Sequence, residues 1–365
     1  MSTICCISDC HLGYMHRLKK ERLEDYEKAF SEAVAKAMEY SPELLIFGGD
    51  LFHHTRPDPR SMKLIINTLM TVAVKTNIVV AIGNHELDGH LKTAYQPLFS
   101  EFHENIHVLS TENPHIILKL SGKKVGIHGF QFLRGREAAE AELKKVTTEL
   151  PGMDEKPEKN ILCLHQAVEG YLAPFEISVR ALKDASAKYD LVLTGHVHKY
   201  QKIKEASCPA YYMGATERTS FNESENVTGF LVFKDMDFKN PLYVETCAVP
   251  MRRIKEDVGK KTPAEINERI KKLIEANADV RCLQISLEAD VAGDSFDIRY
   301  DWEKDYPQYA ILGVSILPKI GNEVIKIEKA QIDPKVIEEY FEKKGMGARK
   351  DLRDACVKFY EKYGG

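Results

Sequence analysis

The chain has 365 residues and a formal net charge of −4 at pH 7. This length exceeds one ordinary core, so we expect a main domain of about 250 residues with smaller appendages. Hydrophobic residues make up 44% and charged residues 29%, a balance that is typical of a globular protein and excludes general disorder. The net negative charge excludes attraction of the whole molecule to nucleic acid, so any such contact depends on local patches.

The sequence contains no apolar run of the ~18 residues that a membrane span needs, and its N-terminus lacks the layout of a signal peptide. Eight cysteines are scattered without a CxxC motif, which argues against a zinc ribbon or a disulfide framework. We therefore expect an intracellular protein, cytoplasmic or associated with the nucleoid, with no membrane contact and with reduced, mostly buried thiols.

Up to about residue 248 the chain alternates short β-branched runs with helical stretches, the pattern of an α/β protein whose sheets are covered by helices. Long helical segments at 20–40 and 60–75 separate the early strands, whereas the later strands follow one another closely. This predicts a parallel-rich layer followed by a second, more antiparallel layer. The expected strands are 3–8, 43–48, 78–82, 115–120, 124–130, 160–164, 190–194, 209–213, 228–233 and 242–248.

After Pro250 the composition changes to a basic helix at 262–277, followed by strand-like runs at 280–288 and 309–317. We expect a small α+β unit here that caps the main domain. Basic residues dominate 252–272, and they either contact phosphate or form a solvated helix face; the sequence leaves both open. These residues are Arg252, Arg253, Lys255, Lys260, Lys261, Arg269, Lys271 and Lys272.

The C-terminal tail has the pattern of two amphipathic helices. Asp333-Pro334 is a plausible N-cap and first helical residue, and Gly345 and Gly347 separate the two helices. Such a pair either packs on its own domain or docks a partner, and we favour a partner.

Seven potential metal ligands fall into five short motifs, each directly after an expected strand. Because ligands in open α/β sheets gather at the carboxyl ends of strands, we expect these motifs to meet. One D-x-H motif is a weak signal, but five such motifs in this order are a strong one. The seven residues are Asp9, His11, Asp50, Asn84, His165, His196 and His198.

This set of ligands suits hydrolysis of a phosphodiester by two metal ions. Two metals ~3.5–4 Å apart supply a strong nucleophile and neutralise charge on phosphorus. Asp50, alone in its motif, is the candidate bridging ligand, and mixed imidazole and carboxylate ligands favour manganese, iron or zinc over magnesium. Neighbouring glycines let the backbone turn sharply. His85, beside Asn84, either protonates a leaving alkoxide or only orients its neighbours.

At these residues the sequence resembles the calcineurin-like metallophosphoesterase superfamily, whose pattern is D-x-H, G-D, G-N-H, H and G-H-x-H. The resemblance covers roughly residues 3 to 235. Further stretches are similar to the Mre-eleven (meiotic recombination eleven) and SbcD family of double-strand-break repair nucleases. They are Asp9-Cys10-His11-Leu12-Gly13 with Arg22, Asp25 and Ala29-Phe30, then Gly49-Asp50-Leu51-Phe52-His53, and Gly214-Ala215-Thr216-Glu217-Arg218.

The resemblance implies a chemical role for each of these positions. One metal would be held by Asp9, His11, Asp50 and His198, and the other by Asp50, Asn84, His165 and His196. His53 would bind substrate near the scissile phosphate, and His85 would be the catalytic residue that assists the leaving group. The family uses manganese, two Mn²⁺ per subunit here, with Mg²⁺, Fe²⁺ or Zn²⁺ as less favoured cofactors, and cleaves DNA as exonuclease and endonuclease.

The resemblance also implies an architecture: a four-layer αββα sandwich with a small α+β capping domain and a C-terminal helix pair. The expected division is a nuclease domain at 1–248, a capping, DNA-contacting domain at 249–318, a linker at 319–332 and a helix-loop-helix at 333–365. The helix pair would bind a coiled-coil ATPase of the structural-maintenance-of-chromosomes type. A homodimer would form through 58–75 and 90–103, unless the apolar stripe of 58–75 packs on its own sheet. The expected source is archaeal.

Two positions depart from the family pattern. Glu86 stands where this family more often has aspartate, and G-N-H-E is the form found in serine/threonine phosphatases. Against a phosphatase, Leu51-Phe52-His53 lacks the arginine of the phosphatase motif. Ala215 removes a hydroxyl but no ligand. The alternatives to a repair nuclease are therefore a small-molecule phosphodiesterase or protein phosphatase with the same core, and a non-enzymatic scaffold.

Overall fold

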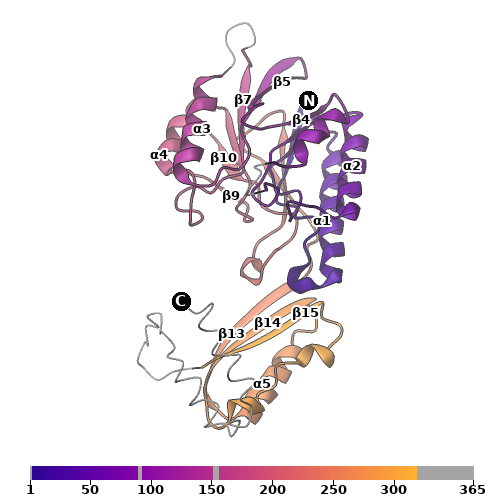
Figure 1. The fold of residues 1–365 in the computed structure, drawn as a ribbon, viewed down its shortest axis with the longest axis vertical. Helices are drawn as coiled ribbons and strands as arrows, with labels where there is room; N and C mark the ends of the chain where they lie inside the picture. The colour runs from indigo at the N-terminus through magenta and orange to yellow at the C-terminus, as the bar shows by residue number, and fades with distance from the viewer. Residues whose placement is uncertain (1, 89–92, 151–155, 319–365) are drawn as a thin grey trace, which may run out of the picture.

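The computed structural model describes residues 2–88, 93–150 and 156–318 (Figure 1). They form two six-stranded sheets and a separate three-stranded sheet. The expected linker at 319–332 and helix pair at 333–365 lie outside the described residues.

The first sheet has the strand order β12-β11-β1-β2-β3-β4. Strands β1 to β4 pair in parallel, β11 pairs antiparallel with β1, and β12 pairs antiparallel with β11. The bounds are β1 Thr3–Ile7, β2 Leu44–Phe47, β3 Asn77–Val80, β4 Ile106–Val108, β11 Gly229–Lys234 and β12 Leu242–Glu245.

The second sheet has the order β5-β6-β7-β8-β10-β9. Its centre from β6 to β10 is parallel, and its two edge strands, β5 and β9, are antiparallel to their neighbours. The bounds are β5 His115–Leu120, β6 Lys123–His128, β7 Lys159–Leu164, β8 Leu191–Thr194, β9 Gln201–Lys202 and β10 Ala210–Tyr212.

The expectation of a second, more antiparallel layer is wrong. Each sheet contains four strands paired in parallel, and antiparallel pairing occurs at one edge of the first sheet and at both edges of the second. The closely spaced late strands β11 and β12 return to the first sheet and pair beside β1, the first strand of the chain. Spacing along the sequence therefore does not say which sheet a strand joins.

Helices cover the outer face of each sheet. In Figure 1, α1 and α2 flank the first sheet, and α3 and α4 lie against the second. The helix bounds are α1 Lys20–Glu39, α2 Pro59–Ala73, α3 Arg136–Thr148, α4 Val179–Ser186 and α5 Pro263–Glu275. Short 3₁₀ turns are η1 His16–Leu18, η2 Gln96–Glu101, η4 Phe221–Glu223, η5 Ser295–Asp297 and η6 Trp302–Lys304.

Strand β1 shows how the layers are joined. Because successive side chains of a strand point to opposite faces, Ile4 and Cys6 enter the core between the two sheets, while Cys5 and Ile7 enter the core under α1 and α2. A strand buried on both faces reads as an unbroken apolar run, as Thr3–Ile7 does after its first residue. The predicted four-layer αββα sandwich is confirmed.

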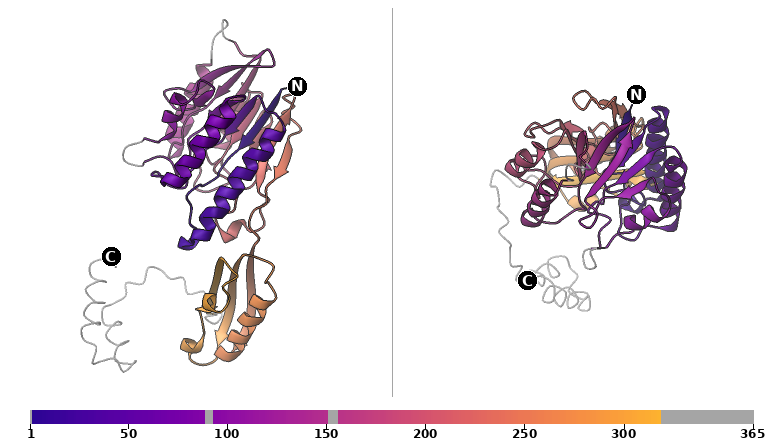
Figure 2. Two further views of the ribbon diagram at one scale, coloured as in Figure 1. Left: turned by 90° about the vertical axis from the view of Figure 1, so that its right-hand side faces the viewer. Right: turned by 90° about the horizontal axis from the view of Figure 1, so that it is seen from above.

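The third sheet lies below the sandwich in Figure 1 and again in the left view of Figure 2. It contains β13 Met251–Lys261, β14 Cys282–Val291 and β15 Ile311–Pro318, all parallel, with α5 on one face. Helix α5 begins with a capping box between Thr262 and Glu265. Sequence analysis does not predict β13, because only part of its length is buried and its charges resemble those of the following helix.

The basic residues of 252–272 are largely paired with acidic neighbours. Arg252 pairs with Asp279 at 2.9 Å, and Arg269 pairs with Glu256 at 2.6 Å. Further ion pairs join Lys261 to Glu265, Lys271 to Glu275 and Lys272 to Glu268. This arrangement favours the solvated face over a free phosphate-binding patch.

The apolar stripe of α2 belongs mainly to the protein's own core. Ile65 and Leu69 are fully buried beneath the first sheet, and Met62 packs against the same cluster. The helix begins at Pro59 after Asp58, whose carboxylate accepts the backbone N–H groups of the first turn. The packing alternative is thus the correct one for the centre of this stripe.

The described cysteines are free thiols, and most are buried as expected: Cys5, Cys6, Cys10, Cys163 and Cys282 are buried, Cys208 is half-buried and Cys247 is exposed. Cys356 lies outside the described residues. No helix within the described ranges combines the length and the apolar character that crossing a membrane requires.

Candidate metal centre

The carboxyl ends of β1, β2, β3, β7 and β8 bring all seven expected ligands to one place. Asp9 and His11 follow β1, Asp50 follows β2 and Asn84 follows β3. From the second sheet, His165 follows β7, and His196 and His198 follow β8. Parallel strands point their carboxyl ends to the same edge, so residues far apart in the sequence meet there.

One group of ligands surrounds His11. Its Nε2 lies 3.0 Å from Nε2 of His198 and 3.9 Å from Oδ2 of Asp50. The Nε2 of His198 lies 3.5 Å from Oδ1 of Asp9. These are the four residues expected at one metal.

A second group surrounds Asn84 and His165. Oδ1 of Asn84 lies 2.8 Å from Nδ1 of His196 and 3.2 Å from Nε2 of His165. The same Nε2 of His165 lies 3.3 Å from Oδ2 of Asp50. These are the four residues expected at the other metal.

Asp50 links the two groups through one oxygen. Its Oδ2 faces both His11 and His165, while its Oδ1 accepts the backbone N–H of His85 at 3.0 Å. Ligand atoms of Asp9, Asp50 and His165 lie within 4.8 Å of one another, as do those of Asp9, His11 and His198. Nitrogen and carboxylate donors that converge this closely fit a pair of divalent cations with Asp50 between them.

The buried carboxylates favour the charged form of two histidines of the site and not of a third. Burial by itself lowers the pKa of His165, but the carboxylates of Asp50 and Asp9 raise it to about 10. Burial likewise lowers the pKa of His198, while Glu223 and Asp9 raise it to about 9. His11 has a pKa well below its usual range, because it is buried and lies against His198. A bound divalent cation would satisfy the same carboxylates and keep the imidazoles neutral.

The backbone of these motifs is held in a conformation that most residues avoid. Asp9, His11, Asp50 and His196 have φ values of 52°, 48°, 49° and 79°. Such left-handed residues persist where surrounding structure fixes them, often at functional sites. At Gly83 a Cβ would collide with the Asp50 carboxylate, so a glycine is required there.

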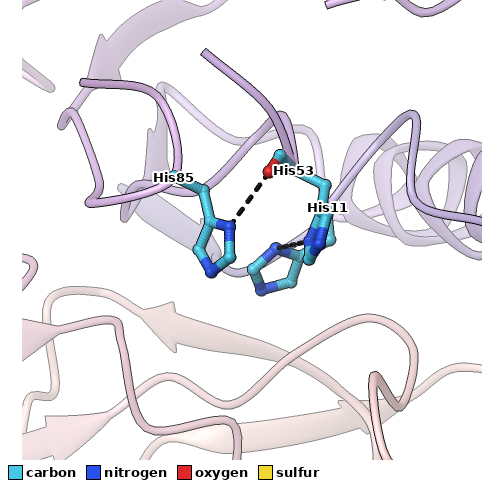
Figure 3. Close-up of side chains that lie close together, drawn as sticks. All are labelled: His11, His53 and His85. Atoms are coloured by element: carbon cyan, nitrogen blue, oxygen red, sulfur yellow. Dashed lines mark hydrogen bonds between the residues drawn. The ribbon is translucent and has the colours of Figure 1, made fainter. Parts of the chain in front are cut away.

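His53 and His85 stack beside the first group of ligands (Figure 3). Nδ1 of His85 lies 3.0 Å from the carbonyl oxygen of His53, which directs its Nε2 away from the backbone. Nδ1 of His53 lies 3.2 Å from Nδ1 of His11. The His53 ring is sandwiched between His85, at 4.5 Å, and Tyr14, at 3.8 Å between ring centroids. Both histidines are half-buried.

Glu86 joins the two loops that carry Asp50 and Asn84. Its Oε1 accepts the backbone N–H of Phe52 at 3.0 Å, and its Oε2 accepts that of Gly83 at 2.9 Å. The side chain is 2% exposed. Because both of its oxygens accept backbone N–H groups, the glutamate of G-N-H-E has a structural use here.

A family model described as Calcineurin-like phosphoesterase matches residues 2–200, more than half of the 365-residue chain. The chain belongs to the calcineurin-like phosphoesterase family. The matched region contains every expected metal ligand as well as His53 and His85.

Relatives of this calcineurin-like phosphoesterase include archaeal proteins named DNA double-strand break repair protein Mre11. The protein of Archaeoglobus fulgidus is 29% identical over 252 residues, which cover 63% of this chain and 54% of the relative. That of Methanosarcina acetivorans is 30% identical over 223 residues, covering 60% of this chain and 34% of the relative. The chain thus spans about half the length of such relatives, or less. Among solved structures, TT1561 of Thermus thermophilus aligns with a TM-score of 0.44 at 13% identity, covering 67% of this chain and 98% of that one.

Sequence analysis of this calcineurin-like phosphoesterase misses Glu223, which contacts an expected ligand, and Tyr14, which stacks on His53. Oε1 of Glu223 lies 3.2 Å from Nδ1 of His198, although 24 positions separate the two residues. Glu223 lies beyond the segment that the family model matches and belongs to none of the five motifs. By contrast, Glu217 in the expected Gly214–Arg218 turn is fully buried and accepts backbone N–H groups, which is a structural use.

Proposed function

We propose that this protein is a manganese-dependent DNA nuclease, both exonuclease and endonuclease, that processes ends in double-strand-break repair. The observation that carries the proposal is the convergence of seven nitrogen and oxygen ligands in two groups that share Asp50 Oδ2. The similarity to Mre11 proteins supports DNA as the substrate in preference to other phosphodiesters.

Asp9, His11, Asp50 and His198 would hold one Mn²⁺, and Asp50, Asn84, His165 and His196 the other. When bound, the metal pair supplies a hydroxide nucleophile and neutralises charge on the scissile phosphate. The mixture of imidazole and carboxylate ligands favours Mn²⁺, Fe²⁺ or Zn²⁺ over Mg²⁺, and the resemblance to the repair nucleases selects Mn²⁺ among them.

His85 would donate a proton to the leaving 3′ or 5′ oxygen. The hydrogen-bonding geometry supports this role, because Nδ1 faces the His53 carbonyl oxygen at 3.0 Å and Nε2 is free to face substrate. His53 would contact the phosphate or its neighbour and hold His85 in place through that carbonyl and the ring stack. Positioned proton transfer of this kind typically contributes about 100- to 10,000-fold in rate.

We further propose that the chain divides into a nuclease domain at 1–248, a capping domain at 249–318, a linker at 319–332 and a helix pair at 333–365. The helix pair would bind a coiled-coil ATPase. A homodimer would form through 58–75 and 90–103, where Met70 on α2 and Val74 just after it are 39% and 67% exposed.

The deciding experiment is cleavage of end-labelled linear and hairpin DNA in Mn²⁺, Mg²⁺ or chelator, with a chromogenic diester alongside. We expect Mn²⁺-dependent DNA degradation that chelator abolishes. Turnover of the diester without DNA cleavage would instead identify a small-molecule phosphodiesterase, and rapid turnover of a monoester would identify a phosphatase. If no substrate is turned over in the presence of metal, the remaining interpretation is a non-enzymatic scaffold.

Deleting 333–363 tests the proposed partner segment. We expect Mn²⁺-dependent cleavage to persist and association with a coiled-coil ATPase to disappear, because the ligands all lie before residue 200. Loss of folding on deletion, measured by circular dichroism, would show instead that the segment packs on its own domain.

A further inference from the structure

His198 is held at both of its ring nitrogens. Nε2 faces the metal groups, 3.0 Å from Nε2 of His11 and 3.5 Å from Oδ1 of Asp9. On the other side, Nδ1 lies 3.2 Å from Oε1 of Glu223 and 3.3 Å from Oγ1 of Thr219. A carboxylate that accepts the N–H of one ring nitrogen fixes the tautomer and directs the other nitrogen's lone pair at a metal.

The Glu223 carboxylate is itself fixed in direction. Its Oε2 accepts the backbone N–H of Thr219 at 2.8 Å, and its Oε1 accepts the Thr219 hydroxyl at 2.8 Å and the Ser220 hydroxyl at 3.2 Å. Its side chain is 18% exposed, so water competes little for these bonds. Both oxygens are therefore engaged, and Oε1 is aimed at His198.

The turn that carries Glu223 is attached to the third sheet. Phe221, the first residue of η4, is 5% exposed and packs with Met251, Cys282 and Ile311, which begin β13, β14 and β15. The next residue, Asn222, accepts a hydrogen bond from the Arg253 guanidinium of β13. The turn beside Glu223 thus shares one apolar cluster with the first residues of all three strands, and the Phe221 ring also faces His16 and Arg17 of the sandwich.

The chain just before this turn is attached to the sandwich. The carbonyl oxygen of Arg218 accepts hydrogen bonds from the hydroxyl of Tyr26 at 2.7 Å and from Arg22 at 3.1 Å, both on α1. Glu217 accepts the backbone N–H of Val249, at the entrance to the third sheet, at 2.8 Å. Residues 217–223 are consequently a short bridge between the two parts of the protein.

We propose that Glu223 is a positioning residue for His198, and that the third sheet sets the place of Glu223 through Phe221 and Asn222. This inference rests on the proposed function, because it concerns the same metal centre. A shift of the third sheet moves η4, turns the carboxylate away from Nδ1 and weakens the metal that His198 would hold.

The test is titration calorimetry of the full chain with Mn²⁺. In Glu223→Gln we expect one of two Mn²⁺ sites to weaken by about 10- to 100-fold, the usual cost of losing such an outer partner, while the other site is unchanged. Glu225→Gln, which removes the same charge from an exposed residue of the same segment, is the control and should match the wild type. The visible spectrum of the Co²⁺-loaded protein should change in Glu223→Gln only, because the ligand geometry changes.

Two results would overturn the role of Glu223. One is unchanged affinity for both Mn²⁺ ions in Glu223→Gln. The other is a lower melting temperature of the metal-free protein with both affinities and the Co²⁺ spectrum intact, which would mean that Glu223 only stabilises its turn.

The attachment to the third sheet has its own test. Phe221→Ala should weaken the same Mn²⁺ site several-fold, whereas Ile270→Ala, a buried truncation on α5 in the core of the third sheet, should lower stability without changing Mn²⁺ affinity. Arg253→Ala, which removes only the bond to Asn222, serves if Phe221→Ala does not fold. Unaltered Mn²⁺ affinity in the folded variants would refute the coupling.

The wild-type titration separates this inference from the proposed function. Two bound Mn²⁺ ions without DNA cleavage would overturn the nuclease and leave the role of Glu223 standing if Glu223→Gln loses one of them. No bound Mn²⁺ in the wild type would overturn both.

Discussion

Two groups of buried or half-buried histidines lie along the second sheet, and they differ in what surrounds them. At the strand ends, His165 and His198 face the carboxylates of Asp9 and Asp50. Within paired strands, His115, the first residue of β5, lies opposite His128, the last residue of β6, with their Nδ1 atoms 2.9 Å apart. The second partner of His128 is an amide, Oδ1 of Asn160, at 2.9 Å.

This difference shows that two histidines lying close together in the protein do not form a metal centre unless carboxylates lie beside them. Among the described residues, the groupings able to hold a metal ion include Asp9, Asp50 and His165, and none includes His115 or His128. Carboxylates raise the pKa of His165 to about 10 against the effect of burial, whereas burial without a carboxylate lowers the pKa of His128 to about 4. Strand ends also leave the backbone free to adopt left-handed turns, which a paired strand does not allow.

The largest effect is expected from removing the Asp50 carboxylate, because carboxylates distinguish the metal centre from the His115–His128 pair. Asp50→Asn removes the charge that both ligand groups share, so binding of both Mn²⁺ ions should fail and DNA cleavage should fall by about 10,000-fold or more. Calorimetry and a cleavage assay measure the two effects. His128→Asn is the control at the other histidine pair, and loss of Mn²⁺ binding there would contradict the distinction.

Substitution of His85 tests whether a histidine of the site acts as a proton donor and not as a metal ligand. In His85→Ala, DNA cleavage should fall by about 100- to 10,000-fold while both Mn²⁺ ions still bind, because a proton donor is lost and no ligand is. Metal content and DNA affinity are measured beside the rate. A drop in metal content would place His85 among the ligands, together with His11 and His53, which form a possible third grouping.

Substitution of Glu86 tests how the loops that carry Asp50 and Asn84 are held together. Glu86→Ala leaves the buried N–H groups of Phe52 and Gly83 without an acceptor, at a cost on the order of 3 kcal/mol in the free energy of unfolding. Urea denaturation of metal-free protein measures it, with Glu112→Ala at an exposed site as the control. A change below the error of the method would show that these N–H groups find other partners.

His128, in the pair with His115, should affect the pH dependence of the free energy of unfolding. The folded pKa of His128, about 4, lies below its ordinary value of 6.5, so the unfolded state binds more protons between these values. The free energy of unfolding should therefore be intact above about pH 6.5 and fall by roughly 2 kcal/mol by pH 5. His128→Gln should remove this part of the fall in urea titrations at pH 7 and pH 5; an unchanged pH dependence would assign it to other groups.

Much of this architecture follows from local sequence. The unbroken apolar runs such as Thr3–Ile7 predict strands buried on both faces, and polar motifs directly after them predict a shared edge. The N-cap Asp58 with Pro59 marks the start of α2. The seven candidate ligands could be named because each lies within a few residues of its strand, and strand direction then determines where they meet.

Other features depend on residues that are distant in sequence, and only the tertiary structure decided them. Strand β11 joins the first sheet because it pairs with β1, more than 220 residues earlier. Glu86 joins two loops by accepting hydrogen bonds from their backbone N–H groups, and no sequence motif indicates these bonds. Glu223 reaches His198 because the third sheet and α1 hold its turn from both sides. Sequence thus specifies ligand types and strand ends, which are local properties, while sheet membership and outer partners arise from packing between distant segments.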